Sequence, residues 1–184
     1  MKRQLVVGIT GASGAIYAQR LLTKLAAQTT AEVVVVFTDK GEQVFRYELG
    51  EDALGQISFQ RYDNNDFFAP FASGSASFDT LIIIPCSMGT LAKAATGLAS
   101  DLISRTADVM LKEGRKLIVV PREAPYNLIH LRNMVQLKEA GGIICPACPS
   151  FYSKPENIMQ AVDTVVDRVL QLAGFDPETY QWGE

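Results

Sequence analysis

Short runs of apolar residues alternate with stretches of helical periodicity along the whole chain. The apolar runs predict strands over residues 4–9, 32–37, 80–85, 116–120 and 142–145. Helical patterns cover about residues 13–27, 41–49, 90–96, 101–113, 124–139 and 155–173. Because strands that are buried on both faces read as continuous apolar runs, this alternation predicts a parallel sheet with helices on both faces. We therefore expect a three-layer α/β fold, in a single domain that spans residues 1–184.

The segment over residues 60–78 breaks this alternation. It is rich in Asn, Ser, Pro and Gly, yet it also contains Phe67, Phe68 and Phe71. A loop of this length in a compact domain is usually functional or packed against something. The three phenylalanines favour a covered loop. It could pack on its own domain, form a subunit contact or supply the apolar wall of a ligand site.

Composition and charge exclude several classes of partner. Charged residues make up 20% of the chain, and the formal net charge is −3. This balance gives no electrostatic reason to expect a nucleic acid or an anionic membrane as partner. No apolar run reaches the length of a signal segment or a membrane span. We expect a cytoplasmic protein.

The three cysteines, Cys86, Cys145 and Cys148, are too few for a disulfide framework. Cys145 and Cys148 have the spacing of a redox pair or of half a zinc site. Zinc lacks further ligands, because there is no second cysteine pair and His130 is the only histidine. Pro149 follows the pair directly and indicates a loop, whereas redox pairs begin helices. We expect small buried thiols at the end of a strand, and no metal site.

Three of the predicted strands end in turns of small or charged residues. Residues 11–14 follow the first, residues 86–90 the third, and Arg122-Glu123 the fourth. The carboxyl ends of parallel strands share one edge, where ligands bind at the point at which strand order reverses. Gly11 and Gly14 allow close backbone approach, and the helix that follows directs its free N–H groups at any ligand there. The sequence therefore predicts one pocket for a phosphate-bearing ligand.

Basic residues give a second indication of a phosphate. Arg105 and Lys112 are seven residues apart on one predicted helix and share a face. Arg122 stands at a strand end, and Arg168 lies on the last helix. A phosphate monoester carries about −1.5 to −2 charges, so two or more cationic side chains are needed to neutralise it. These residues form a site only if the fold brings them together.

The chain resembles the UbiX-type flavin prenyltransferases from Lys2 to Trp182. The segments that carry the resemblance are Thr10-Gly11-Ala12-Ser13-Gly14, Asn65-Asp66, Ala72-Ser73-Gly74-Ser75, Pro85-Cys86-Ser87-Met88-Gly89-Thr90, Arg105-Thr106-Ala107-Asp108-Val109, Leu111-Lys112-Glu113, Pro121-Arg122-Glu123-Ala124-Pro125 and Phe151-Tyr152. The resemblance implies a Rossmann-like (flavodoxin-like) parallel sheet and a homo-dodecamer with sites shared between subunits. It implies that reduced FMN receives a dimethylallyl group at N5 and C6 from dimethylallyl monophosphate, without a metal. The prenylated FMN would pass to a UbiD-type decarboxylase.

The same resemblance implies a role for each matching residue. Those implied to contact FMN are Gly11, Ala12, Ser13, Thr38, Ser87, Met88, Gly89, Thr90 and Arg122. Those implied to hold the prenyl phosphate or the prenyl chain are Arg105, Lys112, Glu123, Tyr152, Arg168 and Phe67. Phe67 stands where the family often has a tryptophan, and it offers a weaker π-face to an allylic cation. Ser13, Glu48 and Glu123 are the expected catalytic residues. Our hypothesis is that Ser13 donates a hydrogen bond near flavin N5, Glu48 completes the polar lining, and Glu123 relays a proton with the phosphate.

Two other functions remain open from the sequence. FMN-dependent decarboxylases of cysteinyl substrates (the HFCD type) share this fold, but they carry Ser-Ala-Asn-Thr where residues 87–90 read Ser-Met-Gly-Thr. Their active-site histidine also lies earlier in the chain than His130. A non-catalytic flavin carrier would need the glycine turn but not Lys112, Glu123 and Arg168. A nicotinamide dehydrogenase is disfavoured, because no tyrosine has a lysine four residues later.

Overall fold

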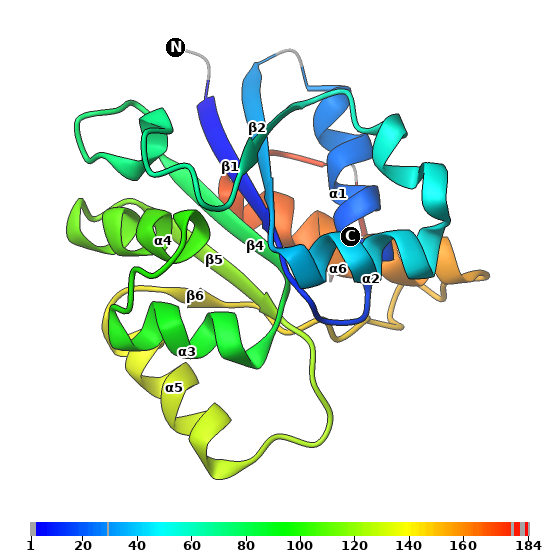
Figure 1. Cartoon of the computed structure of the whole chain (residues 1–184). Helices are drawn as coiled ribbons and strands as arrows, with labels where there is room; N and C mark the ends of the chain where they lie inside the picture. Colours follow the sequence, from blue (N-terminus) through cyan, green and yellow to red (C-terminus); the bar gives the residue numbers. More distant parts are fainter. Residues whose placement is uncertain (1–2, 29, 178, 181–182, 184) are drawn as a thin grey trace.

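The computed structural model describes residues 3–28, 30–177, 179–180 and 183, and within them it forms a six-stranded parallel sheet. The spatial order is β3-β2-β1-β4-β5-β6 (Figure 1). The strands are β1 (Arg3–Ile9), β2 (Ala31–Phe37), β3 (Gln60–Asp63), β4 (Thr80–Cys86), β5 (Lys116–Pro121) and β6 (Ile143–Ile144). Strand order reverses between β1 and β4. This is the position at which open α/β sheets bind ligands.

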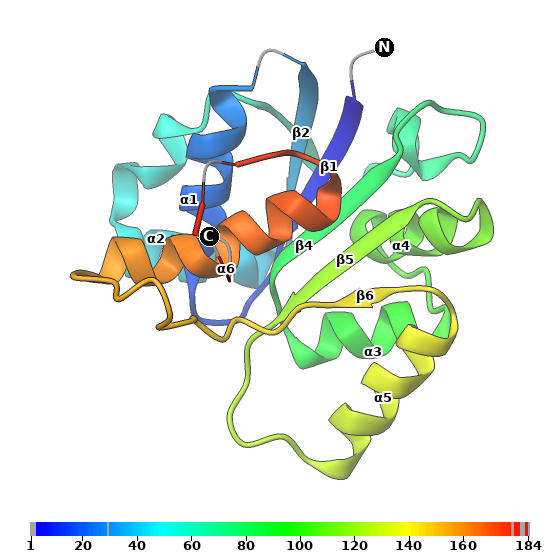
Figure 2. The same ribbon diagram turned by 180° about the vertical axis from the view of Figure 1, so that it is seen from behind.

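Helices cover both faces of the sheet, as Figures 1 and 2 show from opposite sides. Residues of α1 (Ala15–Ala26), α2 (Asp39–Leu49) and α6 (Ile158–Ala173) belong to one buried cluster. Residues of α3 (Met88–Thr96), α4 (Leu102–Lys112) and α5 (Leu128–Glu139) belong to the other. Two short 3-10 helices, η1 (Glu51–Gln56) and η2 (Pro70–Ala72), lie in the connections. The predicted three-layer α/β, flavodoxin-like fold is confirmed.

The continuous apolar runs in the sequence reflect burial of each central strand on both sides. Leu5 and Val7 of β1 face the cluster of α1 and α6, whereas Val6 between them faces the cluster of α3 and α4. Ile82 and Ile83 of β4 divide between the two clusters in the same way. Successive side chains of a strand point to opposite faces, so a strand covered on both sides needs apolar residues at every position.

Strand β3 was not predicted, because it lies inside the segment over residues 60–78 that reads as a loop. It pairs in parallel with residues 34–37 of β2 at the edge of the sheet, and three of its four residues are exposed. An exposed edge strand needs no apolar run, so no periodic signal marks it. In the same segment Phe71 is buried, but Phe67 is 46% and Phe68 98% exposed. Packing on its own domain therefore accounts for Phe71 but not for Phe67 and Phe68, and the alternatives of a subunit contact or a ligand wall stay open for these two.

Several boundaries also differ from the predicted ones. Helix α5 begins at Leu128 rather than near residue 124, because Asn127 provides the N-cap by accepting a hydrogen bond from His130 N at 2.8 Å. Helix α6 begins at Ile158 behind the corresponding cap, Asn157. Helix α2 begins at Asp39, earlier than predicted, and β6 contains only two residues. Among the described residues, no helix combines the length and apolarity that a membrane crossing requires.

Candidate functional site

The three predicted turns lie side by side because hydrogen bonds join the ends of β1, β4 and β5. The Thr10 hydroxyl donates to the Pro85 carbonyl at 2.8 Å and accepts from Ser87 N at 2.8 Å. Arg122 N donates to the carbonyl of Cys86 at 3.2 Å. Thr10 is 1% exposed, so these bonds form away from water. One buried hydroxyl thereby fixes the position of the glycine turn relative to the turn at residues 86–90.

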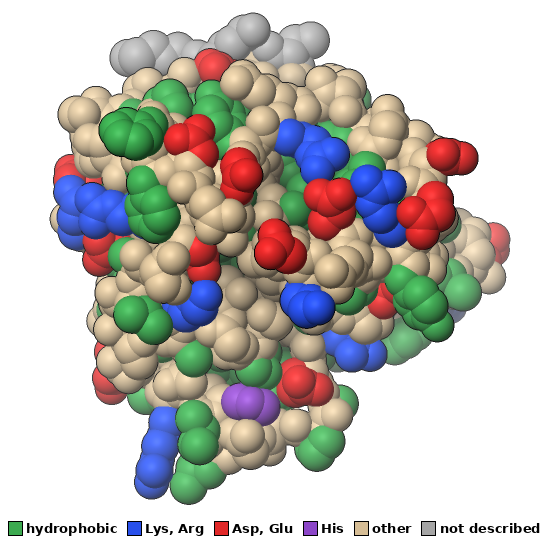
Figure 3. All heavy atoms as spheres, in the orientation of Figure 1, with side chains coloured by type: hydrophobic (Ala, Val, Ile, Leu, Met, Phe, Trp, Pro, Cys, Tyr) green, Lys and Arg blue, Asp and Glu red, His purple; other side chains and the backbone are tan. Residues whose placement is uncertain are grey.

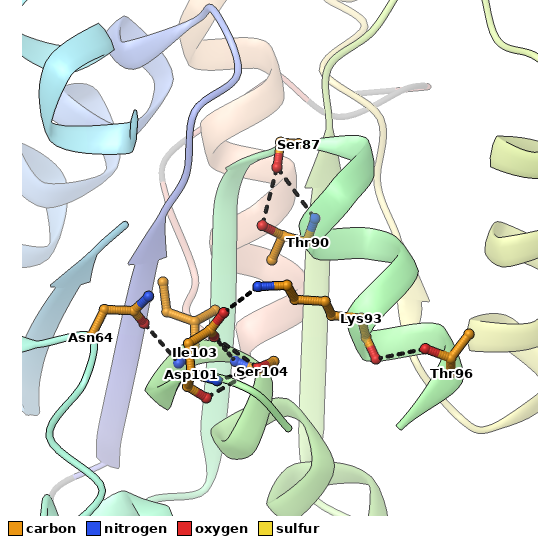
Figure 4. Close-up of polar contacts among 8 residues, drawn as sticks. All are labelled: Asn64, Ser87, Thr90, Lys93, Thr96, Asp101, Ile103 and Ser104. Carbon is orange, nitrogen blue, oxygen red and sulfur yellow. Dashed lines mark hydrogen bonds and ion pairs between the residues drawn. The ribbon is translucent and has the colours of Figure 1, made fainter. Parts of the chain in front are cut away.

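A cleft of about 520 Å³ opens at this edge of the sheet. Five residues of the predicted FMN set line it, namely Gly11, Thr38, Ser87, Gly89 and Thr90. Sequence reasoning assigned no role to Lys40, Asn64, Lys93 and Asp101, which also line it (Figure 4 draws the last three). Asn64 follows the unpredicted strand β3, which explains why it was missed. Asp101 and Ser104 have the spacing of a capping box, and this signal was available in the sequence.

Three helices begin at the cleft, each behind a capping side chain that lines it. Thr38 Oγ1 accepts from Gly41 N at 3.0 Å, and Ser87 Oγ accepts from Thr90 N at 3.3 Å. Asp101 Oδ1 accepts from Ser104 N at 2.8 Å. Helices α2, α3 and α4 therefore direct the positive ends of their dipoles toward one space. Such an arrangement suits an anionic group such as a phosphate.

A second cluster lies around the N-terminus of α1, which has no capping side chain of its own. Glu48 of α2 supplies one, because its Oε2 accepts from Gly14 N at 2.9 Å and from Ala15 N at 2.8 Å. Burial alone would raise the pKa of Glu48, but hydrogen bonds from the Ser13 hydroxyl and these two amides, with the charge of Arg122, lower it. Ser13, Glu48 and Arg122 therefore lie together beside the glycine turn.

The loop after β6 borders this second cluster. Burial raises the pKa of Tyr17, and a thiolate at Cys148 would raise it further, while Arg122 acts in the opposite direction. Burial also raises the pKa of Tyr126, and so do negative charges at Cys148 and Glu123. Cys148 therefore lies within electrostatic range of both Tyr17 and Tyr126.

Cys86 is buried, and burial raises the pKa of its thiol to about 12. The expectation that Cys145 and Cys148 are both buried is wrong for Cys148, which is exposed, whereas Cys145 is half-buried. Among the described residues, no group of three or more His, Cys, Asp or Glu side chains is arranged to hold a metal ion.

The remaining predicted residues do not all reach this edge within one chain. Helix α4 starts at the cleft, so Lys112 at its last position lies about 15 Å farther along the helix axis. There Lys112 pairs with Glu113, next to Gly74. Arg105 is held by the Ala72 carbonyl at 3.1 Å and by Asp108 at 2.8 Å.

The predicted residues on the later part of the chain are exposed. Arg168 donates a hydrogen bond to Gln171 at 3.2 Å. Burial raises the pKa of Cys145, and the charge of Arg168 opposes this with a smaller effect. Tyr152 is also exposed, and Glu123 accepts a hydrogen bond from Ala124 N.

On the face shown in Figure 3, acidic and basic side chains are interspersed, with no large field of one sign.

Comparisons with known proteins agree along the whole chain. Residues 1–174 match the family described as Flavoprotein. The flavin prenyltransferase UbiX of Methanocaldococcus jannaschii is 44% identical over 183 residues, which cover 98% of both chains. The flavin prenyltransferase UbiX of Halalkalibacterium halodurans is 46% identical over an alignment of 193 positions, which covers 97% of this chain and 92% of that protein.

Solved structures show the same likeness. AnUbiX (PadA1), crystallised with FMN and dimethylallyl pyrophosphate, superposes with a TM-score of 0.91 at 39% identity and covers 99% of this chain and 100% of its own. A dodecameric FMN-dependent UbiX-like decarboxylase from Escherichia coli O157:H7 gives a TM-score of 0.90 at 39% identity, with 97% and 98% coverage. The peptidyl-cysteine decarboxylase EpiD, at 18% identity and a TM-score of 0.65, shares the fold alone.

Proposed function

The chain belongs to the UbiX-type flavin prenyltransferases of the flavoprotein family, and from this premise we propose how its residues carry out the reaction. The reaction transfers a dimethylallyl group from dimethylallyl monophosphate to N5 and C6 of reduced FMN. The observation that supports a flavin phosphate in this chain is the cleft at which α2, α3 and α4 all begin. Oxygen atoms of a phosphate can accept from the amides and side chains there.

The residues present fit FMN. Thr38, Ser87, Gly89 and Thr90 would hold the phosphate, and a Cβ at Gly89 would meet nothing within 4 Å, so the backbone there is open to a ligand. Gly11, Ala12, Ser13 and Arg122 would hold the ring, with Met88 buried beneath the turn. Reduced FMN, when bound, supplies the two nucleophilic atoms of the reaction.

Cleavage of the allylic C–O bond releases a phosphate and leaves an allylic cation, so the site must stabilise departing negative charge and exclude water. Arg122 and Arg168, with Tyr152, would hold the phosphate of dimethylallyl monophosphate. Each charge-assisted hydrogen bond contributes about 1.5–3 kcal/mol. Glu123 would relay the proton between the phosphate and the flavin. Glu48 keeps Ser13 and the start of α1 in position through the hydrogen bonds described above.

Lys112 would reach a phosphate only in the site of a neighbouring copy. Within one chain it lies about 15 Å from the start of α4 at the cleft. The exposure of Phe67 and Phe68 in the single chain indicates that another surface covers them. A dodecameric relative supplies a precedent for assembly. We therefore assign Lys112, Arg105 and Phe67 to a site shared between subunits of a homo-dodecamer.

Mass spectrometry of the flavin tests the reaction. The protein is incubated without oxygen with reduced FMN and dimethylallyl monophosphate, and the expected product is FMN that carries one added dimethylallyl unit. Unchanged FMN that stays bound would instead identify a flavin carrier. Release of CO2 from a cysteinyl peptide would identify a decarboxylase.

Subunit mixing tests the shared site. Arg122→Ala and Lys112→Ala chains, each inactive alone, are unfolded together and reassembled in equal amounts. If each site takes Arg122 from one chain and Lys112 from another, about a quarter of the sites receive both side chains. The matched control mixes Arg122→Ala with Ser13→Ala, which affect one chain's part of the site and should restore nothing. Activity in neither mixture would place Lys112 and Arg122 in the same chain's site, and a Lys112→Ala protein that is active alone would remove Lys112 from the reaction.

We also propose that a UbiD-type decarboxylase receives the product and that the reaction takes place in the cytoplasm. Residues 1–184 would act as one domain. The accessible thiol of Cys148 suits a reducing compartment. Co-purification of prenylated FMN with a UbiD-type partner supplied with this protein would test the transfer.

A further inference from the structure

An ion pair between two helices forms one wall of the cleft. Lys93 on α3 donates to Asp101 Oδ2 at 2.7 Å, and both residues line the cleft. Figure 4 shows the Lys93 side chain extending toward the start of α4. The Asp101 side chain is 13% exposed and that of Lys93 37%. The carboxylate is thus the more enclosed partner, and the ammonium group retains access to the cleft.

The two oxygens of Asp101 have separate tasks. Oδ1 accepts from Ser104 N and from the Ser104 hydroxyl, both at 2.8 Å, and so caps α4. Oδ2 faces Lys93. Burial would raise the pKa of Asp101, but the hydrogen bonds from Lys93 and Ser104 lower it. The carboxylate therefore stays charged, and within the part of the chain that the structure describes its ion-pair partner is Lys93.

The other charged groups that line the cleft are Asp39 and Lys40 of α2. Lys40 donates to Gln43 at 3.0 Å, and Asp39 is exposed. The cleft therefore contains two acidic and two basic side chains, together with the three helix starts. Removal of the charge of either Lys93 or Asp101 shifts this balance by one unit, next to the space where an anion would bind.

We propose that the Lys93–Asp101 pair sets the selectivity of the cleft for phosphorylated over unphosphorylated flavin. This inference rests on the proposed function, in which the FMN phosphate occupies the cleft. Lys93 neutralises a carboxylate that would otherwise repel the phosphate. Riboflavin carries no phosphate, so its binding does not depend on the charge of this wall.

The test measures the dissociation constants of FMN and riboflavin by quenching of flavin fluorescence. Lys93→Met should weaken FMN binding about tenfold, because a unit charge facing an anion across a partly hydrated cleft changes its affinity by about that factor. Asp101→Asn keeps an oxygen to cap α4 and frees the ammonium, so FMN binding should tighten. The double variant should return close to the wild-type value. Riboflavin binding should stay constant throughout, and the differences should shrink in 1 M salt.

Lys24→Met is the matched control, since Lys24 pairs with Asp167 and Asp163 between α1 and α6, away from the cleft. This variant removes a lysine–aspartate contact and should leave the ratio of the FMN and riboflavin dissociation constants unchanged. The inference is overturned if Lys93→Met leaves that ratio unchanged, whether both dissociation constants stay constant or both rise by the same factor. If the wild-type protein binds FMN no better than riboflavin, the placement of the phosphate in the cleft is wrong as well. Thermal unfolding of each variant verifies that the folded protein is being compared.

Discussion

Replacement of Thr10 by valine tests whether one buried hydroxyl holds the site's two main turns together. Valine keeps the β-branched shape and replaces only the hydroxyl by a methyl group. The substitution removes the acceptor of Ser87 N, and no other acceptor for this amide is found among the described residues. It also removes one donor to the Pro85 carbonyl, which still receives a hydrogen bond from Thr10 N at 3.3 Å.

The two losses differ in size. An amide left without a partner costs about 1–3 kcal/mol, whereas a hydrogen bond lost from a carbonyl that keeps another donor costs about 0.5–1.5 kcal/mol. The free energy of unfolding should therefore fall by about 2–4 kcal/mol, equivalent to a melting temperature lower by about 5–12 °C in a chain of this size. FMN affinity should fall in parallel, because Ser87 lines the cleft.

The assay is urea unfolding of wild type, Thr10→Val and Thr10→Ser at one fixed protein concentration, since assembly makes stability depend on concentration. Thr10→Ser retains the hydroxyl and should lose only the contribution of one methyl group, about 1 kcal/mol. If the valine variant is as stable as the serine variant, the hydroxyl does not join the two strands as described.

Three further predictions address other parts of the site. Glu48→Gln should lower the free energy of unfolding near neutral pH by less than about 1 kcal/mol, since the side chain is exposed. Because folding lowers the pKa of Glu48, the stabilisation by its carboxylate is present above the unfolded value of 4.5 and is lost as the pH falls through the folded value. Acid unfolding curves should therefore show that the stability of the variant depends less on pH below 4.5 than that of the wild type. Glu123→Gln should leave FMN bound but slow turnover by about 10² or more, and near-normal prenylation in a single-turnover assay would remove Glu123 from the mechanism. Gly41→Ala should destabilise the protein by about 1–3 kcal/mol in thermal unfolding, since its Cβ would lie 3.0 Å from Thr10 Cα and 2.9 Å from the carbonyl carbon of Ile9, and backbone atoms cannot move aside cheaply; a variant that melts with the wild type would contradict this.

The sequence was informative where structure depends on near neighbours in the chain. Strands β1, β2, β4 and β5 carry continuous apolar runs because both their faces are covered, and this signal survives without any knowledge of the partners. It failed for β3, which is exposed at the sheet edge and therefore free of such a run. Helix starts were displaced by a few residues, because the cap at Asn127 and not the periodicity sets where α5 begins.

The residues themselves specified the parallel sheet, the glycine turn and the family, since these depend on local pattern and on short motifs. The spatial relations between distant side chains arose only when the chain folded. Glu48 caps a helix 33 residues earlier, Lys93 balances the charge of Asp101, and Lys112 ends far from Arg122 although both are cationic. Charge and hydrogen bonding act over a few ångströms in space, and sequence separation does not measure that distance.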